Sequence, residues 1–484
     1  MSANRPHAVN APLAQGSGNL AATLQTVSLR RAEHIVAALL LMVILALFYR
    51  DVIFRGRTFL QLGYTAGTMP FSIGGGAYGY PTTGEQLKGG PIDPAAIAWE
   101  NEPFSRRASE LLWQGVLPLW NPSQGMGEPF MANGTAAPFE PIQVIFSVVP
   151  SRYWPLAADL QVLLRYFLAG IFTYLFMRKL GLGLLPGVCA GVAFMLSSYF
   201  ITFGNHHPIR SETLLPLLLY CYERFFTRPF LGNLILTASV ITWVLLASFP
   251  ESGFLVIMMA TLWYTYRSIS HIWQTHFARQ IILARLGGLV LVVSVGLGLA
   301  AFSFLPLVEE VGNALHIHEG GTGLLSLPPV AIMLSVLPGA LPSLAWLPYF
   351  YSSVLALAIL GIVTGVHVPV QRQSLIFFSA YAAVFFLKSY DFPALRWIGL
   401  LPGLSQINIP RYIVPSLSLC CAILAAYGIQ AIIDRRVTLR SMFLIFLGFF
   451  AFCTYWLLGS SNPEIDIPKL AVAIIAALGT VLAV

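Results

Sequence analysis

A short polar turn interrupts the apolar pattern of the chain near its middle. Residues 205–212 read Asn-His-His-Pro-Ile-Arg-Ser-Glu and join two apolar stretches. Charged groups at membrane depth cost several kcal/mol unless they face a cavity or a partner, and a plain turn needs only Gly and Pro. The imidazoles of His206 and His207 and the guanidinium of Arg210 can donate hydrogen bonds to an anionic group. The turn therefore predicts contact with a ligand.

Three further ionisable residues stand at or near apolar stretches. Glu251, in a Phe-Pro-Glu-Ser turn, would either bind a substrate or neutralise Arg210. Arg411 follows Asn-Ile-Pro, and its forked guanidinium matches a phosphate, although a plain interfacial anchor is the alternative. Arg165 lies inside an apolar run, where pairing with a carboxylate such as Asp159, or snorkelling to the interface, would explain it without a functional role.

The composition predicts the elements that must position these residues. Of 484 residues, 57% are hydrophobic and 10% are charged, against about a quarter charged in soluble domains, so a soluble globule is excluded. A membrane-spanning helix needs about 20 apolar residues. The expected fold is an all-α polytopic membrane protein with about twelve transmembrane helices. The apolar runs lie near residues 35–49, 157–177, 187–203, 213–223, 232–249, 253–266, 286–305, 348–366, 374–387, 412–432, 441–459 and 470–484.

The charge pattern predicts the orientation of these helices. The chain has 27 Lys and Arg against 20 Asp and Glu, and no basic run is longer than a pair, which argues against a nucleic-acid partner. If the N-terminus is cytoplasmic, the basic pairs at 30–31, 178–179 and 435–436 fall on the inner side, as the positive-inside rule requires. We therefore expect a cytoplasmic arm at residues 1–32, a transmembrane domain at 33–484, and chemistry on the outer side.

Two outer segments are too long to be simple turns, and long ordered loops commonly carry function. Residues 51–156 form the first extracytoplasmic loop, and residues 306–347 form the second, with an apolar, Pro-rich stretch at 327–342 that is re-entrant or interfacial. Residues 104–115 of the first loop alternate apolar and charged side chains at helical spacing. This spacing predicts an interfacial helix that forms a lid beside the bundle or fills a gap in the fold.

Several motifs bear on nucleotides and metals. The Gly-rich stretch at 74–79 has neither a strand before it nor an apolar helix after it, so we interpret it as a flexible loop. The chain has no phosphate-cradling Gly-Lys-Ser/Thr loop, which argues against a nucleotide-driven pump. His316, His318 and Glu319 could bind a divalent cation such as Mg²⁺ or Mn²⁺, although an ordinary polar loop explains them as well. The metal question stays open.

The first outer loop resembles the outer-loop signature of the YfhO family of bacterial membrane proteins. The likeness lies in Gly-Val-Leu-Pro-Leu-Trp-Asn-Pro at 115–122, Gly-Met-Gly-Glu-Pro at 125–129 and the Ala-Asn pair that ends at Asn133. It continues in Asp93 and in the turns that hold His206, Glu251 and Arg411. YfhO proteins are similar to GT-C glycosyltransferases, so the resemblance implies a GT-C-like bundle. Members are often longer, and we expect a shortened version in this chain.

The resemblance also implies an activity. It is transfer of a sugar from a polyprenyl-phosphate-linked donor to a cell-envelope acceptor (a glycan, a lipid or a protein) on the extracytoplasmic face of the bacterial plasma (inner) membrane. Asp93 is the expected base of an inverting reaction. Asp51 is the second choice, since related enzymes carry a catalytic carboxylate after the first helix, although a simple ion pair with Arg50 would also explain it. The expected substrate-binding residues are Asn121, Asn133, His206, His207, Arg210, Glu251 and Arg411.

A transporter or flippase of a lipid-linked sugar precursor is the rival hypothesis. Such proteins commonly have repeated halves and broken helices near the membrane midplane. Of the 20 acidic residues, 16 fall in predicted outer segments, the others being Glu33, Asp159, Glu223 and Asp434, and no internal repeat is evident. This asymmetry favours the enzyme.

Overall fold

The computed structural model describes residues 15–60, 100–123, 126–247, 249–276, 278–313, 322–335, 354–366, 368–437 and 442–443. Asp93, His316, His318 and Glu319 lie outside these residues, as do nearly all of the last two predicted apolar runs.

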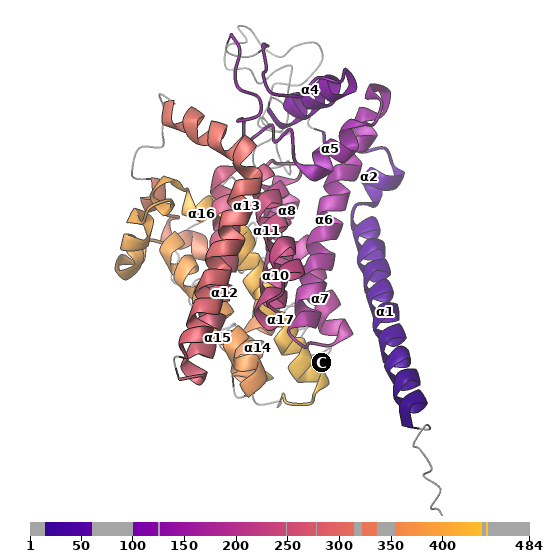
Figure 1. The fold of residues 1–484 in the computed structure, drawn as a ribbon, viewed down its shortest axis with the longest axis vertical. Coiled ribbons are helices and arrows are strands. Elements are labelled where there is room, and N and C mark those ends of the chain that lie inside the picture. The colour runs from indigo at the N-terminus through magenta and orange to yellow at the C-terminus, as the bar shows by residue number, and fades with distance from the viewer. Residues whose placement is uncertain are drawn as a thin grey trace, which may run out of the picture.

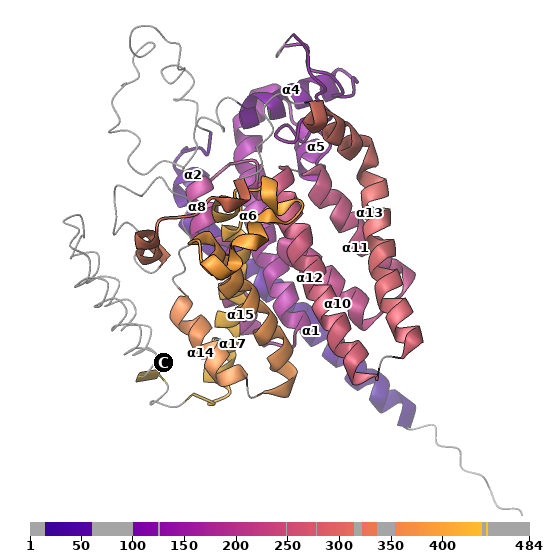
Figure 2. The same ribbon diagram turned by 90° about the vertical axis from the view of Figure 1, so that its left-hand side faces the viewer.

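Within the described residues the regular structure is helical, apart from one isolated bridge between Asn121 and Glu128. The long helices run side by side along the long axis of the molecule, and α4 lies across one end of the bundle (Figures 1 and 2). We call this end the α4 end. The α-helices are α1 (Gln15–Phe48), α2 (Arg50–Phe54), α4 (Glu102–Trp113), α5 (Pro141–Ser147), α6 (Trp154–Lys179), α7 (Leu184–Met195), α8 (Ser198–Phe203), α9 (Ile209–Glu212), α10 (Leu215–Thr227), α11 (Leu231–Leu246), α12 (Pro250–Gln274), α13 (Arg279–Asn313), α14 (Leu355–Gly365), α15 (Pro369–Ser389), α16 (Ile409–Tyr412) and α17 (Val414–Ile433). Short 3-10 helices are η3 (Ser151–Tyr153), η4 (Thr322–Leu324), η5 (Pro329–Ser335), η7 (Pro393–Leu400) and η8 (Leu404–Gln406).

Five of the described helices are long and apolar enough to cross a membrane, and a sixth arises if the pair bent by 92° at Ser389 and Pro393 is one span. The chain is thus a multi-helix protein with several candidate spans. Each of the first ten predicted apolar runs overlaps a helix where the structure describes it, because local hydrophobicity and helix formation go together in an apolar solvent. The total of twelve transmembrane helices stays a prediction.

Two helices extend beyond their apolar runs. Helix α1 begins at Gln15, so the predicted boundary at residues 32 and 33 falls inside a helix. Helix α13 continues through Pro306 to Asn313, so the predicted outer loop 306–347 begins inside a helix as well. Backbone hydrogen bonds propagate a helix into polar sequence, so a helix can continue past the end of its apolar run. The two boundaries therefore stay predictions.

Glycines allow close approach of helix backbones in this bundle. A Cβ at Gly191 would lie 2.7 Å from the carbonyl oxygen of Gly170, where α7 crosses α6. Gly187 lies on the same face of α7, since a Cβ there would lie 3.0 Å from the Tyr174 ring of α6. Helices α14 and α17 meet still more closely, since a Cβ at Gly361 would lie 2.1 Å from the carbonyl oxygen of Leu424.

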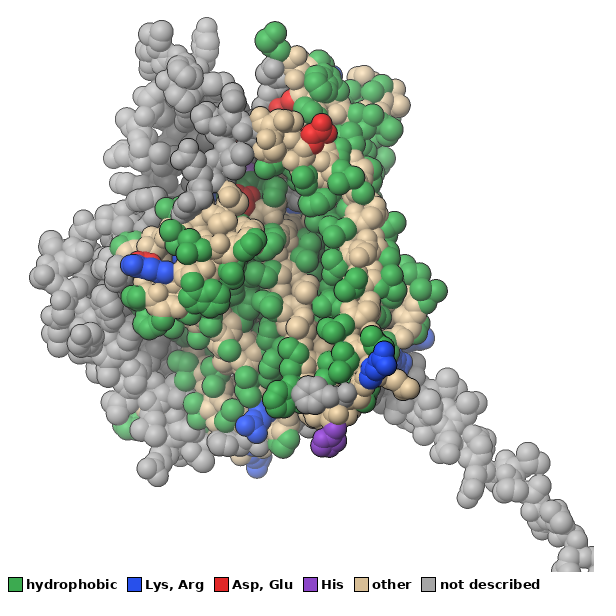
Figure 3. Space-filling view, turned by 60° about the vertical axis from the view of Figure 1, so that its left-hand side comes forward, with side chains coloured by type: hydrophobic (Ala, Val, Ile, Leu, Met, Phe, Trp, Pro, Cys, Tyr) green, Lys and Arg blue, Asp and Glu red, His purple; other side chains and the backbone are tan. Residues whose placement is uncertain are grey.

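Basic side chains gather at the end of the bundle opposite α4. Lys and Arg side chains are visible at that end in Figure 3, and acidic ones are visible near the α4 end. Arg178 and Lys179 occupy the last turn of α6, and Arg224 occupies the last turn of α10, where cations also interact favourably with the helix dipole. Arg178 pairs with Glu33 of α1. We call this end the basic end.

We predict that Gly361→Leu destabilises the protein, because the new side chain would have to enter the backbone of α17. Overpacking of a tight core costs about 1–3 kcal/mol or more. The matched control is Gly298→Leu in α13, where a Cβ meets nothing within 4 Å. Thermal unfolding of both variants in detergent tests this, and equal unfolding midpoints for the two variants would contradict it.

Candidate functional site

Arg210 ties the first outer loop to the bundle. Its guanidinium donates to the carbonyl oxygens of Thr135 at 2.9 Å and Ala136 at 3.1 Å. It also donates to the Ser105 hydroxyl at 3.1 Å and to the Asn101 side-chain oxygen. The side chain is buried in α9, so its donors are directed at the protein's own first loop and α4 rather than at solvent.

A buried ion pair makes a second link between that loop and the bundle. Arg165 of α6 donates to Glu140 at 2.7 Å, and the Trp243 indole of α11 donates to the same carboxylate at 2.7 Å. Glu140 also accepts the Gln143 backbone N–H at 2.7 Å as the N-cap of α5. Burial alone would raise the pKa of Glu140, but the charge and hydrogen bonds of Arg165 hold that pKa below its usual value.

Arg165 does pair with a carboxylate, but the partner is Glu140 rather than the predicted Asp159. Asp159 instead accepts hydrogen bonds from the Thr58 hydroxyl at 2.9 Å and the Phe59 backbone N–H at 2.8 Å. Asp159 therefore holds the start of the first outer loop. Arg165 meets a carboxylate from the far end of that loop, 25 residues before it in the chain.

Two histidines and an arginine meet at the α4 end among aromatic rings. The rings of His206 and His207 lie 4.1 Å apart between centroids, and His207 lies 4.6 Å from the ring of Phe249. The guanidinium carbon of Arg411 lies 5.7 Å from the centroid of the Phe203 ring, which in turn lies 5.4 Å from the ring of His206. Both histidines are buried. We call His206, His207, Arg411 and the neighbouring Glu212 the His–Arg cluster.

Glu212 is a member of this cluster that the sequence reasoning did not select. One carboxyl oxygen accepts from the Tyr199 hydroxyl at 3.1 Å and from the Ser252 hydroxyl at 2.8 Å. The other oxygen is buried and has no hydrogen-bond partner in the part of the chain that the structure describes. Burial raises the pKa of Glu212 to about 8, so the carboxyl is mostly protonated near neutral pH.

The cluster therefore combines two neutral groups, Glu212 and His207, with the cation Arg411. Burial, together with the charges of His206, Arg210 and Arg411, holds the pKa of His207 well below its usual value, so that its imidazole is neutral. Arg411 is the permanent cation. Such a set can donate charge-assisted and neutral hydrogen bonds to an oxyanion.

Asn121 and Asn133 make structural contacts within the first loop. The backbone of Asn121 exchanges two hydrogen bonds of 2.9 Å with Glu128. The Asn133 side chain donates to Glu128 at 3.3 Å and accepts the Ala136 backbone N–H at 2.9 Å. Gly127 has a φ of +110°, and a Cβ there would lie 2.7 Å from the Trp120 ring, which accounts for that glycine in the loop signature.

The remaining predicted residues lie in different places. Glu251 is in the first turn of α12, next to Ser252, and so adjoins the His–Arg cluster. Asp51 pairs with Arg55 at 3.0 Å and with Arg57 at 3.6 Å. Within the described residues, no three His, Cys, Asp or Glu side chains form a metal-binding group. The candidate cation ligands His316 and His318 lie outside those residues.

An apolar groove of about 840 Å³ runs along the bundle, and its lining comes next to the cluster in the chain at α8. Thr202 of α8 lines it, and the next residue, Phe203, is the ring beneath Arg411. The groove is formed by α1, α7, α8, α14 and α17, and its lining includes Leu40, Ile44, Val188, Leu196, Ile201, Val354, Leu357 and Ile429.

Comparisons with known proteins assign no family. No family model matches the chain, and no curated protein sequence matches it. Among solved structures, the chain is similar to ArnT from Cupriavidus metallidurans, in a crystal structure bound to undecaprenyl phosphate. The TM-score is 0.41 and the sequence identity 15%, over 78% of this chain and 64% of that one, so the match spans less than two thirds of ArnT. We draw neither fold nor function from a similarity of this size.

We predict that Glu140→Gln destabilises the protein by about 3–5 kcal/mol, because it leaves the Arg165 charge buried without its counter-ion. The matched control is Glu110→Gln, which removes surface pairs with Arg106 and Arg107, each worth about 0–1 kcal/mol. Denaturant unfolding in detergent measures both. A loss for Glu140→Gln no larger than that of the control would contradict the structural role of the ion pair.

We predict that Glu212 makes the folded protein less stable as pH rises. The pKa of its carboxyl is about 8 in the folded state and 4.5 in a model peptide. The stabilising contribution is full below pH 4.5 and is lost as pH rises through about 8, since ionisation of the folded carboxyl is disfavoured. Unfolding midpoints across this range should fall more steeply for the wild type than for Glu212→Gln. Parallel profiles would contradict the assignment.

Proposed function

We propose that the chain is a membrane glycosyltransferase that uses a polyprenyl-phosphate-linked sugar donor. The observation that carries this proposal is the buried His–Arg cluster, together with an apolar groove whose lining residue Thr202 directly precedes the Phe203 ring beside Arg411. A donor of this class has a long apolar tail and one phosphate-bearing head. The groove offers the tail an apolar lining, and the cluster offers the phosphate a guanidinium beside neutral hydrogen-bond donors.

Arg411 is the proposed main contact for the phosphate. The leaving phosphate gains negative charge as the bond between its oxygen and the anomeric carbon breaks. Arg411 stabilises that charge, His206 contributes a further contact, and protonated Glu212 can donate a hydrogen bond through its O–H. Because the guanidinium of Arg210 is directed at four acceptors of the protein itself, we assign Arg210 to holding the first loop in place.

Asp93 is the proposed base. Its carboxylate takes the proton of the acceptor hydroxyl, whose oxygen attacks the anomeric carbon from the side opposite the phosphate, so the configuration inverts. Asp51 is the second candidate, but its carboxylate already pairs with Arg55 and Arg57. Glu251, His207, Asn121 and Asn133 remain proposed substrate contacts. No step of this reaction is assigned to a divalent cation such as Mg²⁺ or Mn²⁺.

The proposed location is the bacterial plasma membrane, with the α4 end on the extracytoplasmic side. The basic end then faces the cytoplasm, together with the N-terminus, in agreement with the positive-inside rule. A cell-envelope glycan, lipid or protein would be the acceptor.

A flippase for a lipid-linked sugar precursor is the alternative, and one observation favours it. The break between α15 and η7, with its 92° bend, resembles the broken helices of transporters. This break lies at residues 389–393, where α15 ends, and Arg372 lies near the other end of α15. The break is therefore at one end of the helix, whereas transporters break their helices near the membrane midplane. We therefore place the enzyme first.

We predict that the purified protein in liposomes transfers radiolabelled sugar from a synthetic polyprenyl-phosphate donor to a bacterial membrane extract. A general base contributes about 10²- to 10⁴-fold in rate, so Asp93→Asn should lose about that much while remaining folded. Arg411→Gln should also slow transfer strongly. Arg396→Gln, which removes an exposed arginine paired with Asp391, is the matched control and should transfer normally.

Two results would contradict the proposal. Full activity of Asp93→Asn would remove that residue as the base. Movement of labelled donor between leaflets by the wild type, without any consumption of donor, would support the flippase in place of the enzyme.

A further inference from the structure

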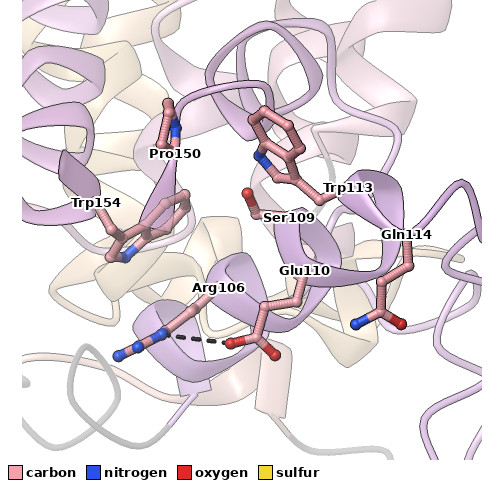
Figure 4. Close-up of a pocket in the computed structure, with 7 residues that line it drawn as sticks. All are labelled: Arg106, Ser109, Glu110, Trp113, Gln114, Pro150 and Trp154. Atoms are coloured by element: carbon pink, nitrogen blue, oxygen red, sulfur yellow. Dashed lines mark ion pairs between the residues drawn. The ribbon is translucent and has the colours of Figure 1, made fainter. Parts of the chain in front are cut away.

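A pocket of about 330 Å³ opens on α4, outside the His–Arg cluster. Its size lies at the lower end of the range for small-molecule sites, about 300–1,000 Å³. The residues that line it are Arg106, Ser109, Glu110, Trp113, Gln114, Pro150 and Trp154, all labelled in Figure 4. We call it the α4 pocket.

Two indole rings form walls of the α4 pocket. Figure 4 shows Trp113 and Trp154 on either side of Ser109. The indole N–H of Trp113 donates to the Val149 carbonyl at 3.3 Å, and that of Trp154 donates to Glu102. Both rings are thus held through their polar edges. Trp154 is buried, so the face open to a ligand is that of Trp113. Trp113 is 57% exposed although its ring is held in this way.

Polar groups stand beside these rings. Glu110 lies 3.5 Å from Arg106 and 3.5 Å from Arg107, both longer than a good charged hydrogen bond, so the carboxylate retains acceptor capacity. The Gln114 amide carries both donors and an acceptor. Because a carboxylate stands at the rim, an anionic ligand is disfavoured, whereas a neutral ligand rich in hydroxyls finds both donors and acceptors.

We propose that the α4 pocket binds a sugar ring of a glycan acceptor. A sugar ring has flat faces of C–H groups, which pack on indole faces, and an edge of hydroxyls, which pair with carboxylate, amide and guanidinium groups. This inference rests on the proposed function and deepens it, since it selects a glycan among the acceptor classes that the sequence left open.

The α4 pocket is connected by hydrogen bonds to Arg210, the residue that holds the first outer loop against the bundle. Trp154 bonds to Glu102, whose neighbour Asn101 accepts from Arg210 and donates to the Asn205 carbonyl at 2.7 Å. Asn205 directly precedes His206. A ligand in the α4 pocket therefore contacts Trp154, which is connected through Glu102 and Asn101 to the turn of the His–Arg cluster.

Insertion of α4 into the membrane interface is the competing explanation for the exposed tryptophan, since Trp is enriched there. The polar side chains that line the same pocket argue against burial in acyl chains, because Glu110, Arg106 and Gln114 would be desolvated together with the rings.

The test measures binding of the full chain, in nanodiscs and fluorescently labelled, to an array of bacterial cell-envelope oligosaccharides. Wild type should bind a subset of the glycans, and Trp113→Ala should weaken that binding about tenfold. Trp397→Ala is the matched control, because Trp397 is also 57% exposed but does not line the pocket, and it should bind as wild type does. Thermal unfolding verifies that both variants are folded.

Absence of glycan binding by wild type, or equal binding by Trp113→Ala, would overturn the proposal. Quenching of Trp113 fluorescence by brominated lipids, measured as the difference between wild type and Trp113→Ala, would overturn it in favour of membrane insertion. The array needs no sugar donor, so it separates the two proposals. Sugar transfer without array binding would contradict only the α4 pocket, and array binding without transfer would contradict only the enzyme.

Discussion

The buried ion pair between Glu140 and Arg165 is the interaction on which the α4 end depends. Removing two charges from water costs several kcal/mol per ion, and the cost is recovered only where the remaining polar atoms are also bonded. Trp243 and the Gln143 backbone N–H supply those bonds. Because Glu140 also caps α5, the same carboxylate fixes the direction in which the first outer loop joins the bundle. Helix α4 packs on α5 through bonds such as that from Ser109 to the Ser147 carbonyl, so its position follows from this ion pair.

The His–Arg cluster derives its properties from burial at the end of α8 and the start of α12. Burial makes Glu212 a neutral acid and His207 a neutral imidazole, which leaves Arg411 as the fixed positive charge. Thr202 lines the apolar groove, and the next residue, Phe203, carries the ring beside Arg411. Arg210 and Asn101 connect the turn that follows α8 to α4. Residues 202–212 thus connect the groove lining, the His–Arg cluster and α4.

Local features could be predicted from the sequence, whereas long-range partners could not. The apolar runs predicted helices because each residue's preference for lipid is independent of its neighbours in space. The polar turn at residues 205–212 could be recognised for the same reason, since its side chains are polar whatever they contact. The partner of Arg165 was predicted as Asp159, six residues away, because proximity in the chain was the available guide. Glu140 was not foreseen, since it reaches Arg165 only through the fold of the whole loop. Glu212 looked like one more turn residue, and its protonation depends on a burial that composition does not reveal.

The central claim is that a lipid phosphate binds the His–Arg cluster while its tail lies in the apolar groove. Photo-crosslinking with a polyprenyl phosphate that carries a diazirine in its tail, followed by peptide mapping, tests it directly. We predict crosslinks on the groove segments of α7, α8 and α14, and we expect Arg411→Gln to abolish them at limiting lipid. Crosslinks on other faces of the bundle, or groove crosslinks that Arg411→Gln leaves unchanged, would contradict the claim.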